Sequence, residues 1–203
     1  MKDLKKTASI LDRILNIASV VIKIISVALV VGLGILAAAF LFDLDPHMVG
    51  TGFDHADLGF VTFTVAENYL PDHRIILCEG AMELILSLIC MVPAHFSVKA
   101  IRNILAPMKN GEPFHNTVST NLKKLANYSC ALGIGLNLQE IISNIFLVKA
   151  YDLHLLLLSE KINHVEFMFV FDLSFLLVYG VLLLLSYIFR YGEQLQQLSD
   201  ETL

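Results

Sequence analysis

The sequence predicts an all-α protein: a four-helix transmembrane bundle with both termini in the cytoplasm and a longer outer loop between the first and second helices. Three observations predict this fold. Of the 203 residues, 56% are hydrophobic and only 16% are charged, whereas an ordinary soluble domain is about a quarter charged. Four apolar runs are each long enough to cross a bilayer, which takes about 20 residues. Eleven of the 14 Lys and Arg residues fall on one side of the bundle that these runs define.

The four runs divide the chain into a single membrane domain, residues 1–203. The predicted spans are about 17–42, 75–98, 125–148 and 165–189. Residues 1–16 are basic and amphipathic, and we expect them to form a short helix on the membrane surface. The first run is longer than the roughly 7 to 15 apolar residues of a signal peptide, so we expect it to be retained.

Basic residues orient the spans, because Lys and Arg concentrate in cytoplasmic loops. The segments that carry most of them are residues 1–16, the loop 99–124 and the tail 190–203. These segments are therefore predicted to be cytoplasmic. The loops 43–74 and 149–164 then lie outside.

Local signals predict where the helices end. Pro107 should stop the helix that follows the second span. Asn116 or Thr117 should cap the next helix, and Gly192 should end the last one. The stretch from Phe60 to Val65, in the first outer loop, is β-prone and predicts a short strand or hairpin.

Acidic and amide side chains lie inside three of the predicted spans. An acid in the middle of a span costs about 2.5 to 3.5 kcal/mol, so we expect these groups to point into the bundle. The helical rise of about 1.5 Å per residue places all the acids at a similar depth, near the outer ends of their spans. The predicted pocket consists of Glu79, Glu83, Asn137, Glu140, Asn144 and Asp172.

Two interpretations of this pocket remain open. In the first, it opens outward and holds something cationic: a proton, a metal ion or a basic group of a small molecule or peptide. Partial protonation of neighbouring carboxylates would then be the switch. In the second, the acids are protonated or hydrogen-bonded to Asn137, Asn144 and Ser87, and they hold the helices together.

The sequence contains none of the motifs HExxH, GxSxG, GxGxxG or a P-loop. It therefore predicts no enzyme, no catalytic residue and no cofactor. No His, Cys or acidic residues have the spacing of a metal motif, so no metal site is predicted. No stretch combines basic and aromatic residues in a way that indicates direct nucleic-acid binding.

Two predicted cytoplasmic stretches resemble a known family. They are the turn Asn110-Gly111-Glu112-Pro113-Phe114 and the ending that runs from Ile188 to Leu203. They are similar to the G-x-P-F turn and the closing F-R-x-G-x-x-L-Q-x-x-x-D-x-T pattern of the bacterial four-span membrane family known as domain of unknown function 2975.

This resemblance implies a location in the bacterial cytoplasmic membrane. Members of the family are often encoded beside a small Cro-like helix-turn-helix regulator, so the resemblance also implies a cytoplasmic regulator as partner. The two stretches would provide the docking surface. Its residues are Gly111, Pro113, Phe114, Arg190, Gly192, Leu195 and Gln196.

Three functions follow as hypotheses. The first is a sensor or regulatory partner of a cytoplasmic transcription regulator, which responds to a proton or cationic ligand at the acidic pocket. The second is a small cation- or proton-linked transporter, an export accessory or an immunity-type protein that uses the same acids. The third is a structural membrane subunit. In each case the lipid bilayer is the main partner, and the sequence leaves the oligomeric state open.

Overall fold

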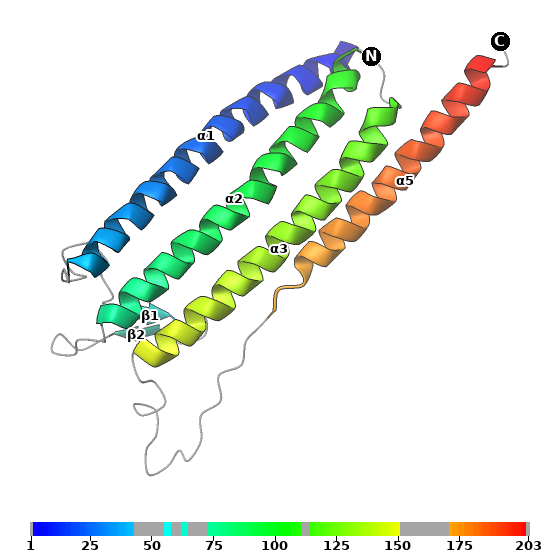
Figure 1. Ribbon diagram of the computed structural model, residues 1–203. Coiled ribbons are helices and arrows are strands. Elements are labelled where there is room, and N and C mark those ends of the chain that lie inside the picture. Colours follow the sequence, from blue (N-terminus) through cyan, green and yellow to red (C-terminus); the bar gives the residue numbers. More distant parts are fainter. Residues whose placement is uncertain are drawn as a thin grey trace. The chain divides into compact units, whose positions relative to one another are not determined.

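The computed structural model describes residues 2–42, 55–57, 62–64, 73–110, 114–150 and 171–201. Within them the chain forms four helices, which Figure 1 shows as long unbroken coils, and one small hairpin. In chain order these are α1 (Lys2–Leu41), β1 (His55–Asp57), β2 (Thr62–Thr64), α2 (His73–Asn110), α3 (Asn116–Ala150) and α5 (Ser174–Glu201). The predicted all-helical membrane fold is thus confirmed in its main feature.

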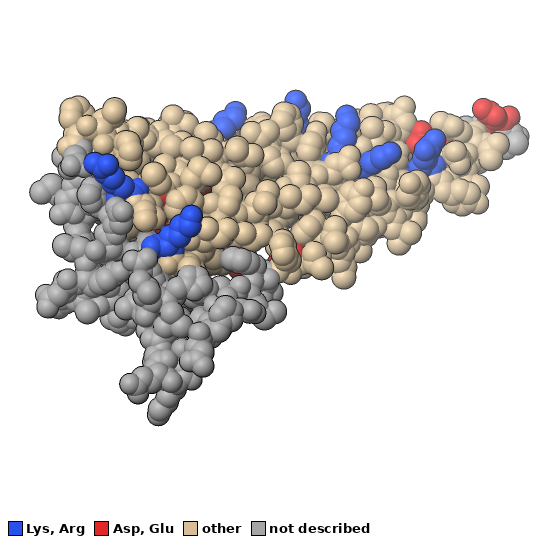
Figure 2. All heavy atoms as spheres, turned by 60° about the horizontal axis from the view of Figure 1, so that its bottom comes forward, with Lys and Arg blue, Asp and Glu red and all other residues tan. Residues whose placement is uncertain are grey.

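Three of the described helices are long and apolar enough to cross a membrane. They are α1 over Lys5–Leu41, α2 over Arg74–Asn110 and α5 over Ser174–Ser199. The third predicted span lies in α3, which is not among them. The polar side chains between Asn137 and Asn144 reduce its apolar character. On the face shown in Figure 2, most of the described surface is uncharged, and Lys and Arg form scattered points rather than a continuous patch.

The helices are longer than the predicted spans. α1 contains 40 residues, which is about 60 Å at 1.5 Å per residue, against a hydrocarbon core of about 30 Å. The amphipathic segment 1–16 therefore belongs to the same helix as the first span, and the prediction of a separate short helix is wrong. α2 also passes through Pro107 and ends at Asn110. A proline inside a helix removes one hydrogen bond, and here the helix continues past it.

α3 begins at Asn116, near its predicted start, but its capping residue and the start of α5 differ from the prediction. The ring of His115, through Nδ1, accepts a hydrogen bond from the backbone N–H of Thr117 at 3.3 Å, so His115 caps α3 in place of Asn116 or Thr117. Residues 171–173 are not helical, and α5 begins at Ser174, inside the predicted fourth span. Residues 165–170 of that span lie outside the described residues, as do most of the outer loops 43–74 and 149–164.

The predicted β-prone stretch forms a strand. β2 lies within it and pairs antiparallel with β1, with His55 opposite Thr64 and Asp57 opposite Thr62. The short hairpin predicted for the first outer loop is therefore present.

The chain divides into two compact units. The first comprises Met1–Ser26, Ile89–Gly135 and Asp172–Leu203, and the second comprises Val27–Leu88 and Leu136–Phe171. The core of the first unit is formed by Ile104, Val118 and Leu122, against which Leu182 and Phe189 of α5 pack.

The second unit brings α1 and α2 together through small residues. Its core contains Leu36, Ala39 and Leu77. A Cβ atom on Gly80 would lie 3.3 Å from the Leu36 side chain, so the absence of a side chain at Gly80 lets α1 approach α2 closely.

Candidate functional site

Glu79 is the most deeply buried acid among the described residues. Only 5% of its surface is exposed, although it lies on the helix α2. The hydroxyl of Ser143, on α3, donates a hydrogen bond to Glu79 Oε1 at 3.2 Å. Glu79 Oε2 is buried and has no hydrogen-bond partner within the part of the chain that the structure describes. The carboxyl group is therefore half satisfied by the protein.

A second polar contact joins the same two helices in the second unit. Gln139 Nε2, on α3, donates a hydrogen bond to Ser87 Oγ, on α2, at 3.1 Å. Glu83 is half-buried and lies between Glu79 and Ser87 along α2, one helical turn from each. We call the pairs Glu79–Ser143 and Ser87–Gln139 the polar pairs. Together they hold α2 to α3 over two turns.

The polar pairs use a different face of α3 from the predicted one. The α3 groups that bond to Glu79 and Ser87 are Ser143 and Gln139, whereas Glu140 is exposed and Asn137 and Asn144 are half-buried. The prediction did not include Gln139 and Ser143, which are four residues apart and form a second polar face of α3 that packs against α2.

Asp172 lies outside the helix that forms the described part of the fourth span. It is exposed and precedes α5, where its two carboxylate oxygens accept hydrogen bonds from the backbone N–H and the hydroxyl of Ser174, both at 2.8 Å. These two hydrogen bonds stabilise the charged form and hold the pKa of Asp172 below its ordinary value. Asp172 thus stabilises the start of α5 from the position before Leu173.

The described residues contain no group of three or more His, Cys, Asp or Glu side chains that could hold a metal ion. The groups around Glu79 are an uncharged hydroxyl and a second acid one turn away. Divalent metal ions such as Ca²⁺ prefer six or more oxygen ligands. The chemistry of this site therefore suits a proton or a single-charged group better than a metal.

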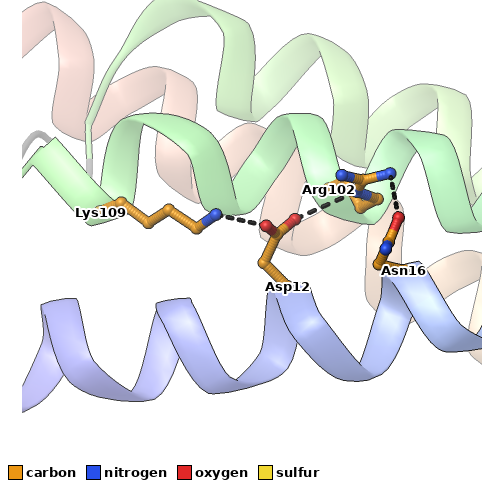
Figure 3. Close-up of polar contacts among 4 residues, drawn as sticks. All are labelled: Asp12, Asn16, Arg102 and Lys109. Carbon is orange, nitrogen blue, oxygen red and sulfur yellow. Dashed lines mark hydrogen bonds and ion pairs between the residues drawn. The ribbon is translucent and has the colours of Figure 1, made fainter.

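A charged cluster lies in the first unit. Figure 3 shows Asp12 of α1 between two cations of α2. Arg102 Nε donates to Asp12 Oδ1 at 3.0 Å, and Lys109 Nζ donates to Oδ2 at 2.5 Å. The Arg102 guanidinium also donates to Asn16 Oδ1 at 3.4 Å. This cluster fastens the N-terminal part of α1 to the last two turns of α2.

Three of the predicted docking residues lie in one aromatic contact or beside it. Phe114 packs against Phe189, with ring centroids 5.7 Å apart. A Cβ atom on Gly192 would lie 2.7 Å from the Phe114 ring, so Gly192 makes room for that ring. Gly192 does not end the helix, because α5 continues to Glu201. Arg190 follows Phe189 and is exposed.

The remaining docking residues divide in two. Leu195 and Gln196 are exposed on α5. Gly111 and Pro113 lie outside the described residues. Among the described docking residues, the contact between the turn motif and the tail motif is therefore the one between Phe114 and Gly192.

Sequence reasoning did not identify Ser143, Gln139 or the Asp12 cluster. The first two could have been found as a second i, i+4 polar pair on α3, offset from the predicted one. The Asp12 cluster joins residues about 90 apart in the chain, and no local pattern signals such a contact. Comparison of the chain with family models, with curated proteins and with solved structures finds no match.

Proposed function

We propose that this chain is an integral membrane protein that registers a proton at the Glu79 carboxyl group and relays its state to a cytoplasmic transcription regulator. The observation that carries the proposal is the half-satisfied carboxyl of Glu79, which is buried, bonded to Ser143 through Oε1 and unpartnered at Oε2 among the described residues. Burying a charged carboxylate that is incompletely paired costs several kcal/mol. A proton on Oε2 removes this cost and changes how α2 and α3 interact.

The division of the chain into two units supports the predicted topology. The first unit collects the N-terminal segment, residues 89–135 and the tail, which contain all three predicted cytoplasmic segments. Both loops predicted to lie outside, 43–74 and 149–164, fall in the part of the chain assigned to the second unit. Glu79 belongs to the same unit, so in this proposal a proton reaches it from outside.

α1, α2 and α3 each contain a residue that favours bending of the helix, which supports helix bending as the response to protonation of Glu79. The chain passes from one unit to the other after residues 26, 88 and 135 within α1, α2 and α3. On α1, Ser26 Oγ donates to the Ile22 carbonyl at 2.8 Å, an interaction that often bends helices. On α2, Pro93 cannot donate to the carbonyl one turn earlier. On α3, Gly135 lowers the helical propensity.

The proposal of a cytoplasmic partner rests on the family resemblance and on a contact within the first unit. Phe114, Phe189 and Gly192 join the turn motif to the tail motif. A helix displacement that reached this contact would alter both motifs at once. A ligand shifts such an equilibrium only if it distinguishes the two states, and protonation of Glu79 provides that difference.

The test compares two identical changes on different acids. Glu79→Gln makes the buried group permanently neutral, and Glu140→Gln makes the same change at an exposed position on α3. The full-length protein is reconstituted in liposomes and titrated with acid, while infrared difference spectroscopy follows the band of protonated carboxyl groups. The other carboxyl groups of the chain contribute to this band in all three proteins. We expect acid to add one component in the parent that Glu140→Gln retains and Glu79→Gln lacks. Identical components in Glu79→Gln and in the parent would contradict the assignment of the site.

A transporter is the second candidate, because Glu83 and the Ser87–Gln139 pair extend the polar groups along α2 beyond Glu79. A pH-sensitive dye inside the same liposomes separates the two functions. Titration of Glu79 without proton flux supports the sensor. Flux that Glu79→Gln abolishes and Glu140→Gln leaves intact supports transport. If neither variant affects titration or flux, the acids have a packing role and both functional proposals fail.

A further inference from the structure

The helix α5 has two faces of different character. One face packs inside the first unit through Phe175, Leu182, Ser186 and Phe189. Ser186 Oγ, for example, donates to the Ser119 carbonyl at 2.8 Å in a buried contact. The opposite face is exposed along the whole helix.

The exposed face carries a regular apolar seam. Its residues are Leu177, Val181, Leu184, Ile188, Tyr191 and Leu195, and all are exposed. They are spaced alternately by four and three residues, which is the a/d spacing of a coiled coil. Leu198 continues the spacing. We call these residues the α5 seam.

The seam residues after Arg190 distinguish a protein partner from lipid as the cover of this face. Before Arg190 almost every residue of α5 is apolar, so any face would suit lipid. After Arg190 the neighbours are Glu193, Gln194, Gln196 and Gln197, and up to Glu201, where α5 ends, the apolar side chains keep only the seam positions. Tyr191 is 63% exposed and Leu195 is 50% exposed. Lipid chains do not cover side chains on a polar helix of this kind.

We propose that the α5 seam binds the α5 seam of a second copy of this chain, in a parallel helix pair that continues from the membrane into the cytoplasm. The seam is continuous across the change from apolar to polar surroundings at Arg190. A soluble partner could cover only the part after Arg190. A second copy presents the same seam in the same direction and at the same depth, and so can cover both parts.

Charge favours the same partner. The positions that flank the seam in the tail are Gly192, Gln194, Ser199 and Glu201, and in a parallel pair the flanking positions of the two helices face each other. The first three are neutral, so two copies do not repel each other over most of the tail, and Glu201 at the end of α5 is the one charged residue among these four. The charged residues Arg190 and Glu193 lie on the outer positions of the heptad, away from the seam.

The test uses the full-length protein in its membrane, with a matched control on the same turn. Leu195→Cys places a thiol on the seam, and Gln197→Cys places one at an exposed position about 200° around the helix. The parent, whose described thiols Cys78, Cys90 and Cys130 are free, gives the background. Under mild oxidation we expect a disulfide-linked dimer of Leu195→Cys in at least about fivefold higher yield than of Gln197→Cys.

A charge variant provides an independent measurement. Two differently tagged copies are co-expressed, and one tag is used to purify both. We expect Leu195→Glu to reduce co-purification about tenfold or more, because it places two like charges in the apolar seam, and Gln197→Glu to leave it unchanged. Equal cross-linking at 195 and 197, cross-linking of 195 to a different polypeptide, or no co-purification of parent copies would each overturn the proposal.

Discussion

The contact between Gly192 and Phe114 can be tested by adding a single methyl group. In Gly192→Ala the new Cβ atom would lie 2.7 Å from Cδ1 and Cε1 of Phe114, closer than real Cβ contacts allow. The ring must therefore move. Because 43% of Phe114 is exposed, it can swing away from Phe189 without a change in the backbone.

Two effects of similar size then oppose each other. Replacing a glycine inside a helix by alanine stabilises the helix by up to about 1 kcal/mol. Separating an aromatic pair such as Phe114–Phe189 costs about 0.5 to 1.5 kcal/mol. In the parent, Gly192→Ala should therefore change the free energy of unfolding by less than about 0.5 kcal/mol. In a Phe114→Ala background the ring is gone, and the same change should stabilise the protein by about 1 kcal/mol.

The measurement is a double-mutant cycle on the protein in detergent micelles, with denaturant unfolding followed by circular dichroism. We expect a coupling free energy of about 1 kcal/mol between the two positions. If Gly192→Ala has the same effect in both backgrounds, the ring does not rest on Gly192, and the packing argument for this glycine fails.

Three further predictions concern other contacts. Asp12→Asn should lower the free energy of unfolding by about 1 kcal/mol at low salt and by less at high salt. The reason is that Arg102 and Lys109 are 41% and 33% exposed, and ion pairs with such exposure are weak and screened by salt. Denaturant unfolding at two salt concentrations checks this prediction, with Asn16→Ala as the milder comparison. Asp172→Asn should lower the unfolding midpoint at neutral pH. This difference should vanish as the pH falls through the lowered pKa of Asp172, because the parent then loses its charged cap as well. If the midpoints of the parent and the variant differ equally at all pH values, the prediction is wrong. Pro93→Ala should restore a helical hydrogen bond in α2 and reduce the acid-induced change in infrared amide bands without removing the carboxyl band, whereas an unaltered amide response would show that α2 does not bend there.

Hydropathy predicted the helices well because lipid imposes a single strong requirement on each segment. α1, α2 and α5 are confirmed as long apolar helices. The sequence predicted that the second helix would continue past its span, but not that it would pass through Pro107 or that the last helix would pass through Gly192. The rules for these two residues describe local preferences that packing can override. Gly192 is retained inside α5 to accommodate Phe114, so the residue type was informative and its assigned role was wrong.

The candidate site was predicted in part, and the reason lies in helix rotation. Glu79 was correctly expected to point inward, since a buried acid is the costliest residue to expose to lipid. The rotation of α3 could not be read from one sequence, because Asn137, Glu140 and Asn144 define one polar face and Gln139 and Ser143 define another. In the structure the second face contacts Glu79 and Ser87 through uncharged groups.

The choice of that face also limits what the site can bind. Had Glu140 and Asp172 joined Glu79, the site would hold several negative charges and would suit a divalent cation. Instead Glu140 is exposed, Asp172 caps a helix, and Ser143 supplies one neutral hydrogen bond to Glu79. A single carboxylate with one unsatisfied oxygen gains most from one positive charge. The proposed sensor should therefore take up about one proton per chain at Glu79. The difference in proton uptake between the parent and Glu79→Gln, measured by titration, gives that stoichiometry directly, and a difference of two or more protons would exclude a single-acid site.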